Sequence, residues 1–350
     1  MNTYSLSYTP KDNKGKLDRN KRNLLIIGSA NNSSYSKIIT NPMNFDAAVA
    51  IYGKNNPLVD SYKLAFDITK DTNIYLVNCP MITDFIEIID TIMHYDFNYI
   101  VPIDIYIDDT FINPITEQKT YFCDYYMERL GLLESLSTLI MTDRPSYLYE
   151  SIDAYLLQLK KAFKAYYNKS EYLLEKFGSN MVFVLNNLEN IYYSNVILAA
   201  LLSQNTFVEY LDSVPFKTHF DIDGFDLNNI NFSYFKHHKA NNTCTVENLK
   251  NLRTTDDIYK WVLIDETIKY VIRHLDLDEF RGRFYSPYVQ LQIQTRIKSI
   301  MNNMQGVIFN QFFIESIRFI KTEPTAGYIN IHLSIVPFGT VEKINVVMGV

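Results

Sequence analysis

The chain has 350 residues, of which 47% are apolar and 21% are charged, a composition typical of a folded protein and not of a disordered one. Its formal net charge is −6, which argues against direct nucleic-acid binding, because proteins that bind phosphates usually carry a basic face. The three cysteines, Cys79, Cys123 and Cys244, show no CxxC spacing. Neither a zinc ribbon nor a disulfide framework is therefore indicated, and a reducing compartment is expected.

No segment approaches the roughly 20 consecutive apolar residues that a membrane-spanning helix needs. The first residues also lack the apolar core of a signal peptide. We therefore expect a protein that is made in a cytoplasm and does not insert into membranes. The length favours two or three domains.

The N-terminal part predicts an arm followed by an α/β domain. Residues 3–9 alternate between polar and apolar side chains, which indicates a short strand. Residues 1–21 are therefore assigned to an N-terminal arm and linker. In residues 22–250, strands and helices alternate, which favours an α/β domain. Its first expected elements are strands at 24–27, 74–77 and 99–107, a helix that begins at Pro57 with Asn56 as its cap, and a helix over 83–94.

The middle of this domain predicts mostly helical structure. Leu156, Leu159, Phe163 and Tyr166 recur at helical spacing. We therefore assign residues 111–178 to a helical insertion, for which the sequence indicates no role. A further strand over 181–185 and a helix over 193–203 follow.

The last hundred residues predict two helices and an antiparallel hairpin, which form a C-terminal α+β domain over 251–338. The first helix begins near Thr255, and the second begins at Ser286 and Pro287 by the same capping logic. The hairpin strands are expected over 314–321 and 328–336, and residues 339–350 form a C-terminal arm strand. The second helix has a single apolar face, formed by Val289, Ile293, Ile297, Ile300 and Met304.

Three acidic residues near the end of the third strand are the best candidates for chemistry. Asp104, Asp108 and Asp109 are spaced as a metal-binding carboxylate cluster is, but Ile103 and Ile107 mark a half-buried strand that ends in a turn. The structural interpretation is favoured, and a carboxylate-dependent hydrolase is kept as an alternative.

Three other segments resemble nucleotide-binding or metal-binding motifs, but their residues do not match the spacing that these motifs require. The turn after Gly28 lacks the further glycines and the lysine of nucleotide-binding loops. Residues 220–226 resemble a calcium loop, but the glycine falls at its fourth position instead of its sixth. His237 and His238 with Cys244 lack a fourth metal ligand at useful spacing. No catalytic, cofactor-binding or metal-binding residues are therefore predicted.

Several stretches resemble the contractile tail sheath proteins of bacteriophages and related injection machines. The opening follows that family: a strand ends in Ile-Gly-x-Ala, an aromatic-glycine pair comes later, and a Pro-Leu helix follows. The later stretches are a helix with an Ala-Ala-Leu-Leu core, an Arg-Thr pair ahead of a long helix, and a Val-Pro-Phe sequence between the hairpin and the last strand. The matching residues are 24–30, 51–53, 57–65, 194–203, 253–254, 336–338 and 341–344.

The resemblance covers residues 22–110 and 180–350. The Pro-Gly-Val-Tyr segment common near the family's N-terminus is absent, and residues 111–178 match nothing in it. The chain is also short for a sheath protein, which implies that it lacks the large outward domains of bigger members.

The resemblance implies a non-enzymatic structural subunit that polymerises helically around a tail tube and contracts to drive the tube through a host envelope. Its implied partners are further copies of itself, the tail tube protein, and the baseplate and tail terminator proteins, and no cofactor is implied. The implied location is the phage tail of a virion that assembles in the host bacterial cytoplasm. The alternative within this class is a sheath subunit of a phage-derived bacteriocin or secretion apparatus.

Strands at both ends of the chain fit such a polymer, because an extended segment can add to a sheet of a neighbouring copy. Gly15 and Gly339 are the expected hinges of the two arms. Alternatively, the last strand completes the sheet of its own domain and the first is a disordered tail. The side chains expected to enter pockets of neighbouring subunits are Tyr4, Leu6, Tyr8, Val341, Ile344, Val346 and Met348.

Overall fold

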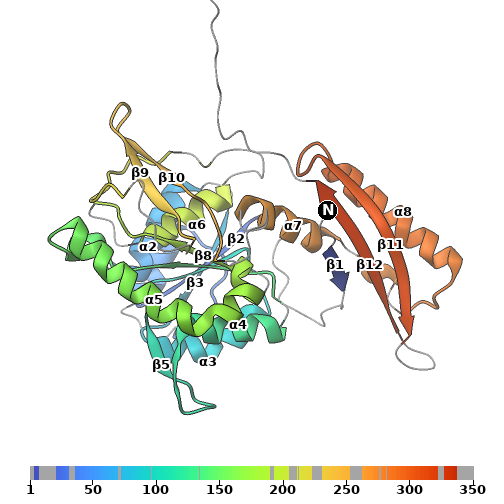
Figure 1. Cartoon of the computed structure of the whole chain (residues 1–350), viewed down its shortest axis with the longest axis horizontal. Coiled ribbons are helices and arrows are strands. Elements are labelled where there is room, and N and C mark those ends of the chain that lie inside the picture. Colours follow the sequence, from blue (N-terminus) through green and yellow to red (C-terminus); the bar gives the residue numbers. More distant parts are fainter. Residues whose placement is uncertain are drawn as a thin grey trace, which may run out of the picture. The chain divides into compact units, whose positions relative to one another are not determined.

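The structure is a computed structural model (Figure 1) that forms two compact units. The larger unit contains the described residues from 21 to 265, and the smaller contains those from 266 onward together with residues 4–7. The described residues are 4–7, 21–30, 36–69, 72–95, 97–133, 135–189, 193–204, 211, 213–222, 231–252, 262–275, 277–280, 282–321 and 327–336.

A five-stranded parallel sheet forms the centre of the larger unit, in the order β3-β2-β4-β7-β8. Every residue of β2 is buried, as expected for a parallel sheet covered on both faces. β2, the first of these strands along the chain, lies between β3 and β4. The chain therefore adds β3 on one side of β2 and then crosses to add β4 on its other side. The strands are β2 (Asn23–Gly28), β3 (Asn73–Asn78), β4 (Tyr99–Pro102), β7 (Thr138–Thr142) and β8 (Met181–Val184).

Helices cover both faces of this sheet. Leu25 and Ile27 of β2 pack in one hydrophobic core with α3 (Ile82–Met93), α4 (Phe122–Leu133) and α5 (Ile152–Phe177). Leu24 and Ile26 pack in a second core with α1 (Phe45–Tyr52), α2 (Pro57–Ile68) and α6 (Ser194–Gln204). Neighbouring residues of β2 thus enter opposite cores, since side chains alternate along a strand.

Among the residues that the structure describes, two antiparallel hairpins and three short 3₁₀ helices lie outside the main sheets. The hairpins are β5 (Thr110–Ile112) with β6 (Lys119–Tyr121), and β9 (Tyr234–His238) with β10 (Thr243–Glu247). The 3₁₀ helices are Ser146–Leu148, Gly178–Asn180 and Asp278–Phe280. Across the described ranges, no helix combines the length and apolar character needed to cross a membrane.

The smaller unit is built from a helix packed on an antiparallel sheet in the order β1-β12-β11. Its strands are β1 (Tyr4–Ser7), β11 (Gln311–Lys321) and β12 (Gly327–Val336). The packed helix is α8 (Pro287–Met304), and the preceding α7 (Val262–His274) contributes Val271 to the same core.

The mixed α/β class, with a parallel core sheet and antiparallel hairpins, confirms the main part of the predicted fold. The caps at Asn56 and Ser286 are also confirmed, since both side chains accept a hydrogen bond from a backbone N–H in the first helical turn. The residues around Thr255, where another helix was expected to begin, lie outside the described residues.

Two details of the predicted secondary structure differ in the structure. Residues 111–178 are mostly helical, as expected, through α4 and α5, but they also contain β7, a strand of the central sheet, and most of the β5–β6 hairpin. The five residues of β7 are all buried, and so short an apolar run has no periodicity that separates strand from helix. The third strand ends at Pro102 instead of residue 107, because Asp104 has a φ of 59°, outside the β region.

Candidate functional site

The antiparallel sheet of the smaller unit brings the start of the chain onto its C-terminal hairpin. β11 and β12 pair along almost their whole length, with a bulge between Ile314 and Ser316. β1 pairs with β12 on the opposite side, so that Tyr4 is opposite Leu333 and Leu6 is opposite Ile331. β12 is therefore the central strand, and β1 and β11 occupy its two edges.

The hydrophobic face of this sheet is set by alternation along both hairpin strands. Ile317 is opposite Ile331, and Ile314 is opposite Leu333, and all four side chains belong to the core shared with α8. Because opposite residues in an antiparallel pair share a face, the register also places the positions of Tyr4 and Leu6 on the core-facing side. The alternate positions Arg318, Asn330 and His332 make the other face polar.

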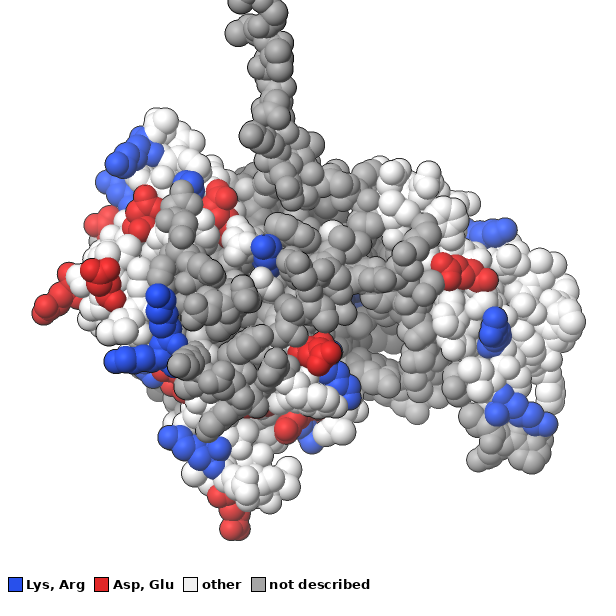
Figure 2. All heavy atoms as spheres, viewed as in Figure 1, with Lys and Arg blue, Asp and Glu red and all other residues white. Residues whose placement is uncertain are grey.

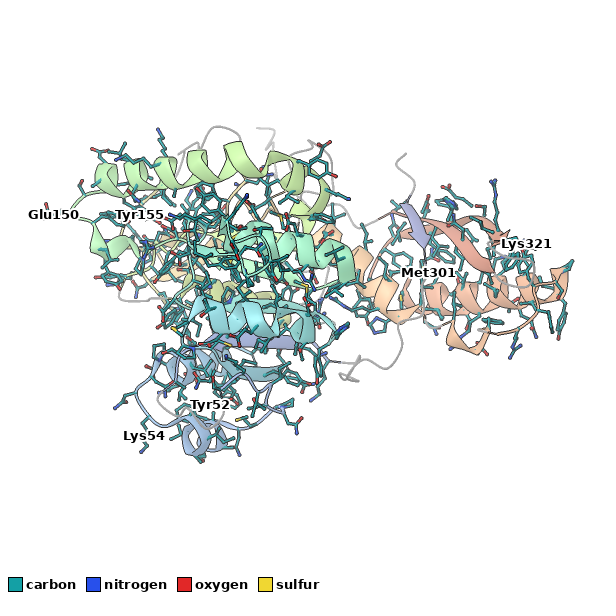
Figure 3. All side chains as sticks on the ribbon, turned by 90° about the horizontal axis from the view of Figure 1, so that it is seen from below. Tyr52, Lys54, Glu150, Tyr155, Met301 and Lys321 are labelled. Carbon is teal, nitrogen blue, oxygen red and sulfur yellow. The ribbon has the colours of Figure 1, made fainter. Side chains whose placement is uncertain are left out.

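Helix α8 supplies the other half of this core. Its buried face consists of Val289, Ile293, Ile297, Met301 and Met304. Figure 3 shows Met301 on the sheet-facing side of the helix. The predicted apolar face is thus confirmed, except that the fully buried position in the last turns is Met301 and Ile300 is only partly buried.

Only two of the predicted interface residues lie in the described part of the chain. Tyr4 and Leu6 lie in β1, paired with the hairpin of their own chain. The other predicted interface residues, and the predicted hinges Gly15 and Gly339, lie outside the described residues; these interface residues are Tyr8, Val341, Ile344, Val346 and Met348. The alternation over 328–336 predicts the strand that became β12, but no pattern in the sequence indicates its register, or that Ile331 and Leu333 lie opposite the first strand.

The three acidic candidates occupy a structural turn. The Asp109 carboxylate accepts hydrogen bonds from the Tyr106 N–H at 2.8 Å and from Arg144 Nη2 at 2.9 Å. Asp104 is exposed at a positive φ, and Ile103, Ile105 and Ile107 are buried as expected. Within the described residues, no group of three His, Cys, Asp or Glu side chains could hold a metal ion. The bonds of Asp109 support the structural interpretation of this segment.

A buried carboxyl group that the sequence analysis did not identify follows β7. Asp143 accepts a hydrogen bond from the Asn186 N–H at 2.8 Å, and Tyr155 of α5 lies beside it. Burial raises the pKa of Asp143 to about 7, since the charged form is poorly solvated there. A cavity of about 10 Å³ adjoins it, lined in part by Arg144 and Leu159, which is room for about one water molecule. Tyr155, near the start of α5, is labelled in Figure 3.

The crevice in which open α/β sheets usually bind ligands is filled. The strand order reverses between β2 and β4, and ligands of such sheets typically bind beyond the carboxyl ends of these strands. Here Ile103 packs against Gly28 so closely that a Cβ on Gly28 would lie 2.9 Å from Ile103 Cδ1. Asn195 of α6 donates a hydrogen bond to the Pro102 carbonyl at 2.8 Å. The chain's own side chains therefore occupy this position.

Charged side chains of both signs are interspersed over the face shown in Figure 2. On the described part of that face, no stripe of basic residues runs across either unit. This mixed pattern differs from the basic face that phosphate-binding proteins present.

No protein-family model matches the sequence, and no curated protein matches it. Three solved structures, by contrast, share the fold over nearly the whole chain. A chain of the six-fold symmetrised baseplate of the anti-feeding prophage has a TM-score of 0.62 and 12% identity, over 98% of this chain and 97% of that chain. A chain of the contracted helical sheath of the same prophage has a TM-score of 0.62 and 11% identity, over 98% of each chain.

The third structure is the sheath tail protein Lin1278 from Listeria innocua. Its TM-score is 0.57 at 8% identity, over 91% of this chain and 95% of that chain. The chain thus has the fold of contractile tail sheath proteins, which are phage-like structural proteins. At the level of the fold, this confirms the resemblance found in the sequence.

Proposed function

We propose that this chain is a structural subunit of a contractile tail sheath. The observation that supports the proposal most is the match in fold with a subunit of a contracted helical sheath, which covers 98% of both chains. The similarity therefore includes the parallel-sheet unit and the smaller unit with its hairpin. At 11% identity, the TM-score of 0.62 shows a common fold alone, and the function follows as our inference from it.

The proposed partners are other copies of this chain, a baseplate, a tail tube and a tail terminator, within a phage tail that assembles in a bacterial cytoplasm. The first two draw support from the baseplate and sheath assemblies in which structures of this fold occur. The proposed division into an arm (1–21), an α/β domain (22–250), a sheath domain (251–338) and an arm strand (339–350) is part of the same proposal.

The proposed mechanism uses strands as links between subunits. A head-to-tail contact that does not close into a ring generates a helix of subunits. Strands from both ends of each subunit pair with sheets of its neighbours, while the segments around Gly15 and Gly339 absorb changes in orientation. Contraction is then a rigid-body rotation between two packings, with the linking strands kept in place.

A sheath subunit of a phage-derived bacteriocin or secretion apparatus is the second candidate. It is favoured by the anti-feeding prophage structures, which have the highest TM-scores among the three described above. Neighbouring genes distinguish the two: capsid and terminase genes indicate a phage, and their absence indicates an injection apparatus.

A carboxylate-dependent hydrolase is disfavoured. Asp109, one of its three acidic residues, is bonded to the Tyr106 N–H and to Arg144, and the sheath fold is one of structural proteins. We therefore propose that the chain is not an enzyme.

Negative-stain microscopy of the purified full-length protein tests the proposal. We expect tubes or rings at high concentration, and their loss when residues 1–20 and 339–350 are both removed. Circular dichroism confirms that the truncated protein is folded. The paired control is Asp104→Ala with Asp108→Ala, which removes two acidic candidates and should leave assembly intact. Tubes that form equally well without both ends contradict the strand-exchange mechanism.

A further inference from the structure

In this structure β1 occupies the edge of β12 in its own chain. All four residues of β1 pair with residues 330–333, in antiparallel register. We propose that this intrachain pairing is the resting state of the subunit, and that it blocks assembly until β1 is exchanged with another copy. The inference rests on the proposed function, because it concerns how strand exchange begins.

The topology of the sheet allows only one strand at this position. β12 has two edges, of which β11 holds one and β1 holds the other. The hairpin pairing extends over residues 311–321 and 327–336, so β11 cannot be displaced without loss of the core against α8. A β1 strand from a second copy can therefore join β12 only where the subunit's own β1 has left.

The covalent connection within one chain favours the intrachain pairing. β1 and β12 belong to the same chain, and a segment supplied through a short linker typically has an effective concentration of about 1 mM. At a subunit concentration of about 10 µM, the chain's own β1 therefore has an advantage of about 100-fold over the β1 of another copy. Isolated subunits should remain closed at that concentration.

The exchange of β1 between subunits leaves the number of β1–β12 pairings nearly unchanged. In the closed subunit and in the polymer alike, each β12 pairs with one β1, so the number of β1–β12 ladders hardly changes on assembly. The β1–β12 pairing therefore links subunits and adds little to the net free energy of association, which must come from other contacts, the proposed C-terminal arm strand among them. This is the behaviour of a swapped element.

At the growing end of the polymer, the intrachain pairing does not inhibit the addition of a subunit. The last subunit has donated its β1 to the one before it, so the edge of its own β12 is vacant. An incoming subunit exchanges one pairing for an equivalent one there, whereas the first two subunits break two intrachain pairings and form only one between them. The inference therefore predicts a lag before spontaneous growth, and fragments of preformed polymer should abolish this lag.

A reversible covalent lock tests the inference. Ser5 is opposite His332 in the β1–β12 register, at positions that alternate with the core-facing ones. Opposite residues of an antiparallel pair have Cα atoms about 4.5–5.5 Å apart, within the range that a disulfide spans. The double variant Ser5→Cys, His332→Cys can thus be oxidised into a closed subunit. The native Cys79, Cys123 and Cys244 are buried and should not interfere.

The expected result depends on whether the double variant is oxidised before or after assembly. Oxidation of the dilute variant should yield a monomeric intrachain disulfide and reduce tube formation at least 10-fold, and a reductant should restore it. Oxidation after assembly should instead give a ladder of covalent multimers on a non-reducing gel. The matched control is Arg318→Cys with Asn330→Cys, which joins β11 to β12. That pairing is the same in both states, so this disulfide should leave assembly unchanged.

Two results would overturn the inference while the proposed function stands. One is assembly of the closed disulfide form as readily as of the reduced form. The other is failure of the dilute variant to form the intrachain disulfide, since β1 would then not lie on its own β12. If the wild-type protein forms no polymer at any concentration, with or without seeds, the proposed function fails and the inference fails with it.

Discussion

Asp143 shows how a single residue acquires an unusual property from its position. The carboxyl group is buried at the end of β7 and accepts a hydrogen bond from the Asn186 N–H. Burial raises its pKa to about 7 from an ordinary value of 3.8. The folded state therefore binds this proton more tightly than the unfolded state does.

We predict that this residue destabilises the protein as the pH rises. The contribution favours folding fully below about pH 4, and it is lost progressively up to about pH 7, where the folded carboxyl group loses its proton. Asp143→Asn should remove this dependence, so that the variant gains stability relative to wild type between pH 5 and pH 8. The expected gain is a few kcal/mol, at about 1.4 kcal/mol per pKa unit.

Urea unfolding of both proteins at several pH values measures the difference. Glu150→Gln, which removes an exposed carboxylate near the start of α5, serves as a charge-matched control. A constant difference between Asp143→Asn and wild type across this range contradicts the prediction.

Single residues are also the features that the sequence predicts least well. The close spacing of Asp104, Asp108 and Asp109 suggests a carboxylate cluster, and yet Asp109 bonds to Tyr106 and Arg144 in a turn. Asp143, in contrast, stands alone in its segment. Its burial depends on α5, which packs over the end of β7, and no local pattern indicates that packing.

At the scale of elements, α8 was the most predictable part of the chain. The Ser286 side chain caps it and Pro287 occupies its first turn, and the apolar residues recur every three or four positions. These signals are local, which is why they could be identified without the structure. β7 was missed because five consecutive apolar or hydroxyl residues fit a buried strand and a buried helix equally well.

We predict that Ile297→Ala lowers the free energy of unfolding of the smaller unit by about 2–5 kcal/mol. Ile297 is completely buried between α8 and the hairpin, so the substitution leaves a cavity. Lys298→Ala, at the next and exposed position, should change stability by less than about 0.5 kcal/mol. Denaturant titrations followed by circular dichroism compare the two variants. Equal effects would show that the face assigned to the core is incorrect.

At the scale of the whole molecule, the hydrophobic residues form separate cores. Two cores lie on the two faces of the parallel sheet, and a third joins α8 to the hairpin. The third shares no residue with the first two. Stability should therefore not be uniform along the chain.

We predict that core substitutions act mainly within their own unit. Ile297→Ala should speed amide hydrogen exchange in α8, β11 and β12 but not in β2, β4 and β7. Phe183→Ala, which removes a buried ring that packs edge-on against Phe163, should do the reverse. Mass spectrometry of the exchanged peptides reads out both patterns. Faster exchange throughout the chain in both variants would mean that the two units unfold together.

Local patterns in the sequence predict the class of fold, the capped helices and the hairpin, because these depend on signals within a few residues of one another. The sequence also carries the resemblance to contractile tail sheath proteins, through the order and spacing of short motifs. The tertiary structure alone decided that β7 belongs to the central sheet, that Asp143 is buried, and that β1 pairs with β12. Each of these depends on contacts between distant segments, and local periodicity does not encode which strands pair or in which register.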